Sequence, residues 1–131
     1  DGGFGQNPAA LATAHESDIA VIWVIMNNHA FGTIAGLEAA HYGTTFATVF
    51  EKDGKSYSPD YAAIARAYGV EGIKVESAAG LKPALERAIA LNKPVVLDVY
   101  MKNEPVPTAG HWNIMDIYSP GKKVHHVATG D

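Results

Sequence analysis

The sequence predicts an α/β domain in which helices cover both faces of a parallel sheet. Residues 19–26 form a continuous apolar, β-branched run, which is typical of a strand buried on both faces. Helical and strand signals alternate along the chain, and this alternation favours parallel strands joined by helices. The chain has 131 residues, of which 47% are hydrophobic, so we expect one domain or part of one.

The predicted elements follow in the order α-β-α-α-β-α-β. Asn7 and Pro8 give the start signal of the first helix, because a capping residue and a proline at the first helical position favour initiation. The buried strand at 19–26 comes next. Residues 31–40 are expected to be at least partly helical although they contain two glycines, and the polar residues 42–57 are expected to form a loop.

The second half begins with a clear helix signal, in which Ser58 is the cap and Pro59 lies in the first turn. Gly69 ends this helix, and a short strand is expected at 73–76. The next helix ends near residue 91 and starts either at Ser77 or only at Pro83, and a third strand follows at 95–100. Residues at helical spacing mark the predicted buried faces of these two helices: Tyr61, Ile64, Ala65, Tyr68, Leu85, Ala88 and Ile89.

The domain is expected to cover residues 1–101. Residues 102–131 contain prolines and glycines without a helical or strand period, and we interpret them as a tail that could act as a lid, with His111 and Trp112 as candidate contacts. Glycine-rich turns such as residues 1–5 normally follow a strand. We therefore expect the chain to be a fragment of a larger protein that lacks the first strand or strands of its sheet.

Composition excludes several classes of function. The chain carries 10 basic and 14 acidic residues, so it lacks the positive surface that nucleic acids or anionic membranes require. The apolar run at 19–26 is far shorter than the roughly 20 residues of a membrane-spanning helix. Because there are no cysteines, disulfides and Cys-ligated zinc are excluded. Without a secretory signal, a cytoplasmic location is expected.

Two loops are expected to meet at one edge of the sheet. Asp1 and Asn28 are separated by one predicted helix and one strand, which places both beyond the carboxyl ends of parallel strands, where such sheets bind ligands. Carboxylate and amide oxygens suit Mg²⁺, which completes its coordination with phosphate oxygens and water. Gly2 and Gly3 expose backbone N–H groups that an anion can approach. These residues together indicate a site for a magnesium diphosphate.

The same residues resemble a known signature. Asp1-Gly2-Gly3-Phe4 and residues 27–34, which begin Asn27-Asn28, resemble the Gly-Asp-Gly and Asn-Asn motifs of thiamine diphosphate-dependent enzymes, although the first glycine is absent. Residues 58–70 and 93–99 resemble the rest of their diphosphate-binding domain. The similarity is greatest to the group of acetolactate synthase, benzoylformate decarboxylase and 2-hydroxyacyl lyase.

The resemblance implies a role for each residue of the motif. Asp1 and Asn28 would ligate Mg²⁺ through their side chains and Ala30 through its backbone carbonyl. Gly2 and Gly3 would donate N–H groups to the diphosphate of the cofactor. The cofactor's thiazolium ring and the substrate would lie along four further residues, which are Phe31, Gly32, Thr33 and Ile34. Some family decarboxylases have an acidic residue near the position of Ile34, and an aliphatic side chain there cannot transfer a proton.

The resemblance also implies partners. The glutamate that activates the cofactor belongs to a pyrimidine-binding domain of a neighbouring subunit, so an oligomer, either a dimer or a tetramer, is expected. We interpret the chain as part of a transferase or lyase that makes or breaks C–C bonds in small 2-oxo or 2-hydroxy acids, as acetolactate synthase does. The alternative is a degenerate module of the same fold without catalysis. His29 either contacts the substrate or is a solvated loop residue.

Overall fold

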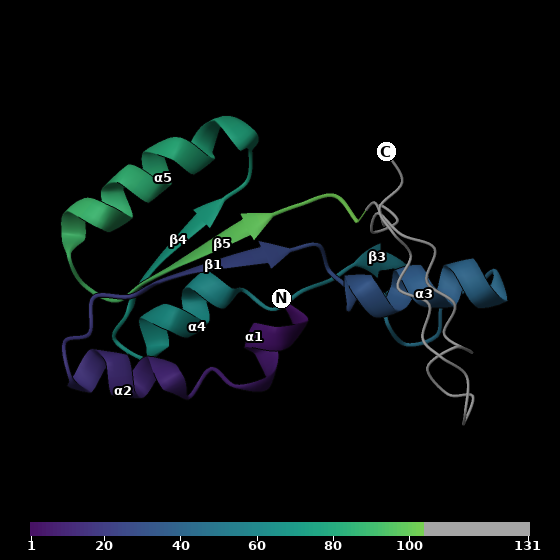
Figure 1. Cartoon of the computed structure of the whole chain (residues 1–131), viewed down its shortest axis with the longest axis horizontal. Coiled ribbons are helices and arrows are strands. Elements are labelled where there is room, and N and C mark those ends of the chain that lie inside the picture. The colour runs from purple at the N-terminus through teal and green to yellow at the C-terminus, as the bar shows by residue number, and fades with distance from the viewer. Residues whose placement is uncertain (104–131) are drawn as a thin grey trace, which may run out of the picture.

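A computed structural model describes residues 1–103 of the chain, and the prediction of a lid formed by the tail with His111 and Trp112 lies outside them. The centre of the fold is a three-stranded parallel sheet in the order β1 (Ile22–Asn27), β5 (Val95–Tyr100), β4 (Glu71–Val75). Ile22 pairs with Val95, which in turn pairs with Glu71. The strands all point the same way in Figure 1. The predicted parallel α/β fold is confirmed.

Helices lie on both faces of the sheet (Figure 1), as predicted. On one face, α2 (Ala10–Glu16) and α4 (Tyr61–Ala67) pack against Ile25 and Val96. On the other face, α5 (Ala78–Leu91) packs against Val95 and Leu97. Each of these buried aliphatic side chains contributes about 1.5 to 3 kcal/mol to folding.

The first part of the chain differs from its prediction in two ways. Residues 1–5 were expected to be a turn, but Gly2–Gln6 form a short helix, α1, because Asp1 caps it by accepting a hydrogen bond from Gly2 N. Asn7 therefore ends α1 instead of starting the next helix, and α2 begins at Ala10.

The strand at 19–26 was predicted to be buried on both faces, and this was wrong for β1. Val24 and Met26 are 47% and 65% exposed, because α5 covers β5 and β4 but does not extend over these two residues. The strand that is buried on both faces is β5, in the middle of the sheet, whose residues 95–98 are all 0% exposed.

The helix after Pro59 begins at Tyr61, because Asp60 rather than Ser58 is its cap. The carboxylate of Asp60 accepts a hydrogen bond from Ala63 N at 2.8 Å. Tyr61 and Ala65 are buried as predicted, whereas Tyr68, predicted to be in the core, is 36% exposed because the helix has already ended.

For α5, the start at Ser77 is confirmed, since the Ser77 hydroxyl accepts a hydrogen bond from Gly80 N. Ala88 is buried as expected, but Ile89 is 67% exposed, and Ala84 occupies the buried face instead.

The predicted helix at 31–40 is α3 (Gly32–Tyr42), which extends beyond the carboxyl end of β1 (Figure 1). The predicted loop after it is largely irregular, and it contains one short antiparallel hairpin of β2 (Glu51–Lys52) and β3 (Lys55–Ser56). Within residues 1–103, no helix is long and apolar enough to cross a membrane.

Close packing of α4 on β4 depends on Gly72. A Cβ atom at this position would collide with the backbone carbonyl of Ala62 on α4, and a backbone atom cannot rotate away as a side chain can. Glycine is therefore required where this helix crosses the sheet.

We predict that Gly72→Ala lowers the free energy of unfolding of the intact protein by about 3 kcal/mol or more, the upper end of the cost of overpacking. Urea unfolding measures this change. Gly80→Ala is the matched control, because its added Cβ would make ordinary contacts with Ser77 and Val75, and alanine favours a helix by about 1 kcal/mol. Equal stabilities for the two variants would contradict the proposed contact.

A surface ion pair links the start of α4 to β4. Lys74 Nζ lies 2.8 Å from Asp60 Oδ2, and the hydrogen bond from Lys74 holds the pKa of Asp60 below its ordinary value of 3.8. Because the pKa is lowered in the folded state, Asp60 stabilises the protein above pH 3.8, and this contribution is lost as the pH falls through the folded pKa.

We predict that Asp60→Asn, which keeps a capping oxygen, lowers the unfolding free energy near neutral pH by no more than about 1 kcal/mol, since both side chains are partly exposed. The difference from wild type should disappear in acid below the folded pKa. Unfolding curves at a series of pH values test this. Glu86→Gln, in the more exposed Lys82–Glu86 pair, is the control and should leave the unfolding free energy near neutral pH almost unchanged. A difference for Asp60→Asn that persists in strong acid would refute the assignment.

Candidate functional site

Asp1 meets the loop of residues 28–30 at the carboxyl end of β1. The amino group of Asp1 donates to the carbonyl oxygen of Met26 at 3.3 Å, which places the residue beside the end of the strand. Its carboxylate accepts a hydrogen bond from Ala30 N at 3.1 Å through Oδ2 and from Gly2 N at 2.7 Å through Oδ1. The structure therefore brings together two segments that lie far apart in the sequence.

The loop turns sharply at His29, which has a φ of 59°, in the left-handed region that non-glycine residues rarely adopt. This turn lies between Asn28 and Ala30, the two predicted ligands of the loop. Gly32 allows the amide of Asn28 to lie close to the start of α3, since a Cβ at residue 32 would collide with Asn28 Nδ2. Within residues 1–103, the side chain of Asn28 forms no hydrogen bond, so its amide oxygen remains available.

A returning segment fixes this loop from the other side. Phe31 N donates to the carbonyl of Thr48, and Phe50 N donates to that of His29, each at 2.8 Å, so Ala30 pairs with Val49. Neither bond uses the carbonyl oxygen of Ala30.

The carboxylate of Glu38 on α3 holds the returning segment in place. Its Oε2 accepts hydrogen bonds from the Thr48 hydroxyl at 2.6 Å and from Phe46 N at 3.0 Å. These hydrogen bonds lower the pKa of Glu38. The loop is therefore anchored to its own following helix through this segment.

The four residues predicted to lie along the cofactor and substrate form the start of α3. The rings of Phe31 and Phe50 make an edge-to-face contact at 5.1 Å, and the Phe31 ring lies so close to Gly2 that a Cβ there would collide with it. Phe31 and Gly32 are half-buried, whereas Thr33 and Ile34 are exposed. Gly3, by contrast, has open space where a Cβ would lie, so its backbone can be approached closely.

The site rests on a buried polar network that the sequence analysis missed. Asn27 and Asp98 are both 0% exposed, and Asn27 Nδ2 donates to Asp98 Oδ1 at 2.9 Å and to the Ser58 hydroxyl at 2.8 Å. Asp98 Oδ2 accepts from Tyr61 N at 3.2 Å. A single acidic residue inside an otherwise apolar central strand was the available signal, because a buried charge needs partners.

The donor set at this edge suits Mg²⁺. A carboxylate, an amide oxygen and a backbone carbonyl are hard oxygen donors, which Mg²⁺ prefers. The side chain of Asn28 and the carbonyl of Ala30 are not used by the hydrogen bonds described above, so the residues present fit such an ion. Among residues 1–103, no three His, Asp or Glu side chains gather in a way that could hold a metal.

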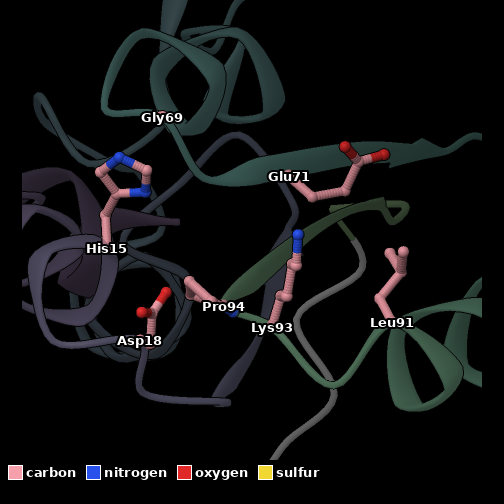
Figure 2. A pocket seen from close by; sticks show the side chains of 7 residues that line it. All are labelled: His15, Asp18, Gly69, Glu71, Leu91, Lys93 and Pro94. Carbon is pink, nitrogen blue, oxygen red and sulfur yellow. The ribbon is translucent and has the colours of Figure 1, made fainter.

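A pocket of about 300 Å³ lies at the opposite end of the sheet and contains none of the predicted site residues. Figure 2 shows His15 and Asp18, from α2 and the turn after it, on one side, and Glu71 and Lys93 on the other. Glu71 begins β4 and Lys93 precedes β5, which places this pocket at the amino ends of the strands.

Comparison with known proteins identifies the domain. Residues 1–99 match the family model described as "Thiamine pyrophosphate enzyme, C-terminal TPP binding domain"; thiamine pyrophosphate is another name for thiamine diphosphate. The matched segment contains Asp1, the loop 28–30 and the Asp98 network, so the match and the geometry concern the same part of the fold.

Curated relatives agree with this match. The chain is 36% identical over 105 residues to the "Putative thiamine pyrophosphate-containing protein YdaP" of Bacillus subtilis, a stretch that covers 80% of this chain and 17% of that protein. It is 34% identical over 99 residues to the "Probable acetolactate synthase large subunit" of Methanocaldococcus jannaschii, covering 76% of this chain and 16% of that protein. The matched part of the chain thus spans about one sixth of the length of these relatives. The chain belongs to the family of thiamine pyrophosphate enzymes, and its residues 1–99 correspond to their C-terminal cofactor-binding domain.

Proposed function

We propose that this domain binds magnesium and the diphosphate of thiamine diphosphate as one half of an active site for joining small 2-oxo acids, in the manner of acetolactate synthase. The observation that carries the proposal is the meeting of the Asp1 carboxylate with the loop 28–30, where Ala30 N lies 3.1 Å from Asp1 Oδ2. The name of the Methanocaldococcus jannaschii relative supports the choice of reaction.

Each part of the site has a distinct task. Asp1 and Asn28 provide side-chain oxygens for the cation, and the carbonyl of Ala30 provides the third protein oxygen. Gly2 and Gly3 provide backbone N–H groups for the diphosphate, and of the two Gly3 is the freer, since Gly2 N already donates to Asp1. Because two segments share the cation, the site forms only when α1 and the loop 28–30 hold their relative positions.

The remaining parts of the site come from elsewhere in the assembled enzyme. Bound thiamine diphosphate would supply a carbon nucleophile for a carbonyl carbon and an electron sink for the negative charge that results. We assign the activating glutamate to a pyrimidine-binding domain of a second subunit, which makes the working unit an oligomer, and we place the enzyme in the cytoplasm. Ile34 at the exposed start of α3 offers a 2-oxo acid an apolar surface and no proton donor, which disfavours simple decarboxylation.

We predict that Asn28→Leu weakens the binding of thiamine diphosphate, measured by calorimetry with saturating Mg²⁺ on the intact protein, by about 100-fold or more. The variant removes one ligand oxygen, and loss of even an outer partner of a metal site costs about 10- to 100-fold. Removing Mg²⁺ with a chelator should abolish binding to the wild-type protein as well.

The matched control is Asn7→Leu, the same substitution at an exposed residue at the far end of α1. It should bind like the wild type. Wild-type affinity in Asn28→Leu, or no binding by the wild-type protein, would reject the proposed site and leave the degenerate, non-catalytic module as the better account.

The reaction class is tested by turnover. With Mg²⁺, thiamine diphosphate and pyruvate, the intact enzyme should condense two pyruvate molecules into one acetolactate with release of one CO₂. Product analysis by mass spectrometry measures this outcome directly. Release of acetaldehyde instead would indicate a decarboxylase, and cleavage of 2-hydroxyacyl substrates without condensation would indicate a lyase; either result would contradict the proposed carboligation.

A further inference from the structure

The buried carboxylate of Asp98 is connected to both halves of the proposed site. Through Oδ1 it accepts from Asn27, the residue directly before the loop 28–30. Through Oδ2 it accepts from the backbone of Tyr61, whose ring packs edge-to-face on Phe4 of α1 at 5.6 Å. We propose, on the basis of the function proposed above, that Asp98 is a positioning residue that sets the geometry of the magnesium site without touching the ion.

The direction of these hydrogen bonds determines how the Asn27 amide is oriented. An ionised carboxylate can only accept hydrogen bonds, so Asp98 requires the NH₂ group of Asn27, rather than its oxygen, to face it. Ser58, the second partner of Asn27 Nδ2, imposes this direction less strictly. Its hydroxyl donates to the carbonyl of Pro59 at 3.3 Å and accepts from Asn27, but it can rotate and donate to another acceptor. Of the two partners, Asp98 is the one that cannot become a donor, so it imposes the orientation of the Asn27 amide more strictly than Ser58 does.

With its NH₂ group held in this way, Asn27 directs its Oδ1 toward the metal-binding loop. That oxygen accepts a hydrogen bond from His29 N at 3.4 Å. His29 is the residue with the left-handed φ of 59°, and the turn at this residue separates Asn28 from Ala30. The backbone carbonyl of Asn27 also accepts from Met101 N at 2.8 Å, which fixes the end of β1 against the end of β5. The orientation of one buried amide therefore helps to hold the turn at His29, together with the bonds that the loop makes to Asp1 and to the returning segment.

Asp98→Asn tests this inference because it keeps the size of the side chain but replaces one of its two acceptor oxygens with a donor NH₂ group. Tyr61 N still needs an acceptor, so the new amide turns its oxygen to Tyr61 and its NH₂ to Asn27, which opposes the present orientation of the Asn27 amide. In the intact protein, we expect the dissociation constant of Mg²⁺ to rise at least about tenfold, which is the lower end of the cost of losing an outer partner of a metal site. Calorimetric titration with Mg²⁺ in the presence of thiamine diphosphate measures this change. In the protein without metal or cofactor, the His29 amide should exchange with deuterium faster by a factor on the order of ten, since its acceptor is no longer held in place.

The double variant Asn27→Asp/Asp98→Asn provides the rescue. The amide introduced at position 98 can donate to the carboxylate introduced at position 27 and accept from Tyr61 N. That carboxylate can accept from His29 N, and the Ser58 hydroxyl can rotate to donate to it. Apart from the 3.3 Å bond from Ser58 to the Pro59 carbonyl, every bond of the network is retained while the charge moves from one strand to its neighbour. We therefore expect Mg²⁺ affinity and His29 exchange close to those of the wild type. If Asp98→Asn does not fold, the double variant by itself tests the proposal. A folded double variant with weakened Mg²⁺ affinity overturns it.

Val75→Ala is the control for a purely structural effect, because Val75 is 3% exposed and lies in the core under α5, on the face opposite Asp98. It should lower stability without changing Mg²⁺ affinity or His29 exchange. If Asp98→Asn behaves like this control, Asp98 has only a structural role and the inference is wrong. If the wild-type protein binds no Mg²⁺, the proposed function fails instead, and the exchange of the His29 amide still tests the positioning role.

Discussion

One constraint shapes the carboxyl end of the sheet: Asp98, a carboxylate buried in the central strand, must have hydrogen-bond partners. A charge inside a protein is costly unless hydrogen bonds replace the water it loses. Asp98 obtains these bonds from the side chain of Asn27 on β1 and from the backbone at the start of α4. Three elements are therefore fixed relative to one another at the carboxyl end of the sheet, while the aliphatic residues of β5 provide the core on both faces.

The proposed cofactor site is built on this frame from segments that have few contacts of their own. Helix α1 has five residues, and the loop 28–30 has no regular structure apart from the bridge to Val49. Their positions come from neighbours: Phe4 packs on Tyr61, Asp1 binds Ala30 N, and the returning segment at 46–50 is tied to Glu38. Such a site can be placed accurately because its supports are buried, although its ligands remain near the surface.

Much of the fold could be predicted because its signals are local. β-Branched runs, the Ser77 cap and Gly69 mark elements without knowledge of the tertiary structure, and the proximity of residue 1 to the loop 28–30 followed from the rule that parallel strands end at one edge. The predictions that were wrong concern burial and capping, which depend on tertiary packing. The exposure of Val24, Met26 and Ile89 is set by how far α5 extends across the sheet, and the choice of Asp60 over Ser58 as a cap follows from Ser58 binding Asn27. The importance of Asp98 could not be derived from spacing, because its partners come from distant segments.

In the proposed site, Asp1 and the loop 28–30 hold one cation together. The most direct test is a crystal structure of the intact protein grown with Mg²⁺ and thiamine diphosphate. We expect a Mg²⁺ ion with oxygens of Asp1, Asn28 and Ala30 at about 2.0 to 2.1 Å and diphosphate oxygens completing its octahedron. A cofactor bound at another edge of the sheet, or a cation that contacts neither Asp1 nor Asn28, would contradict it.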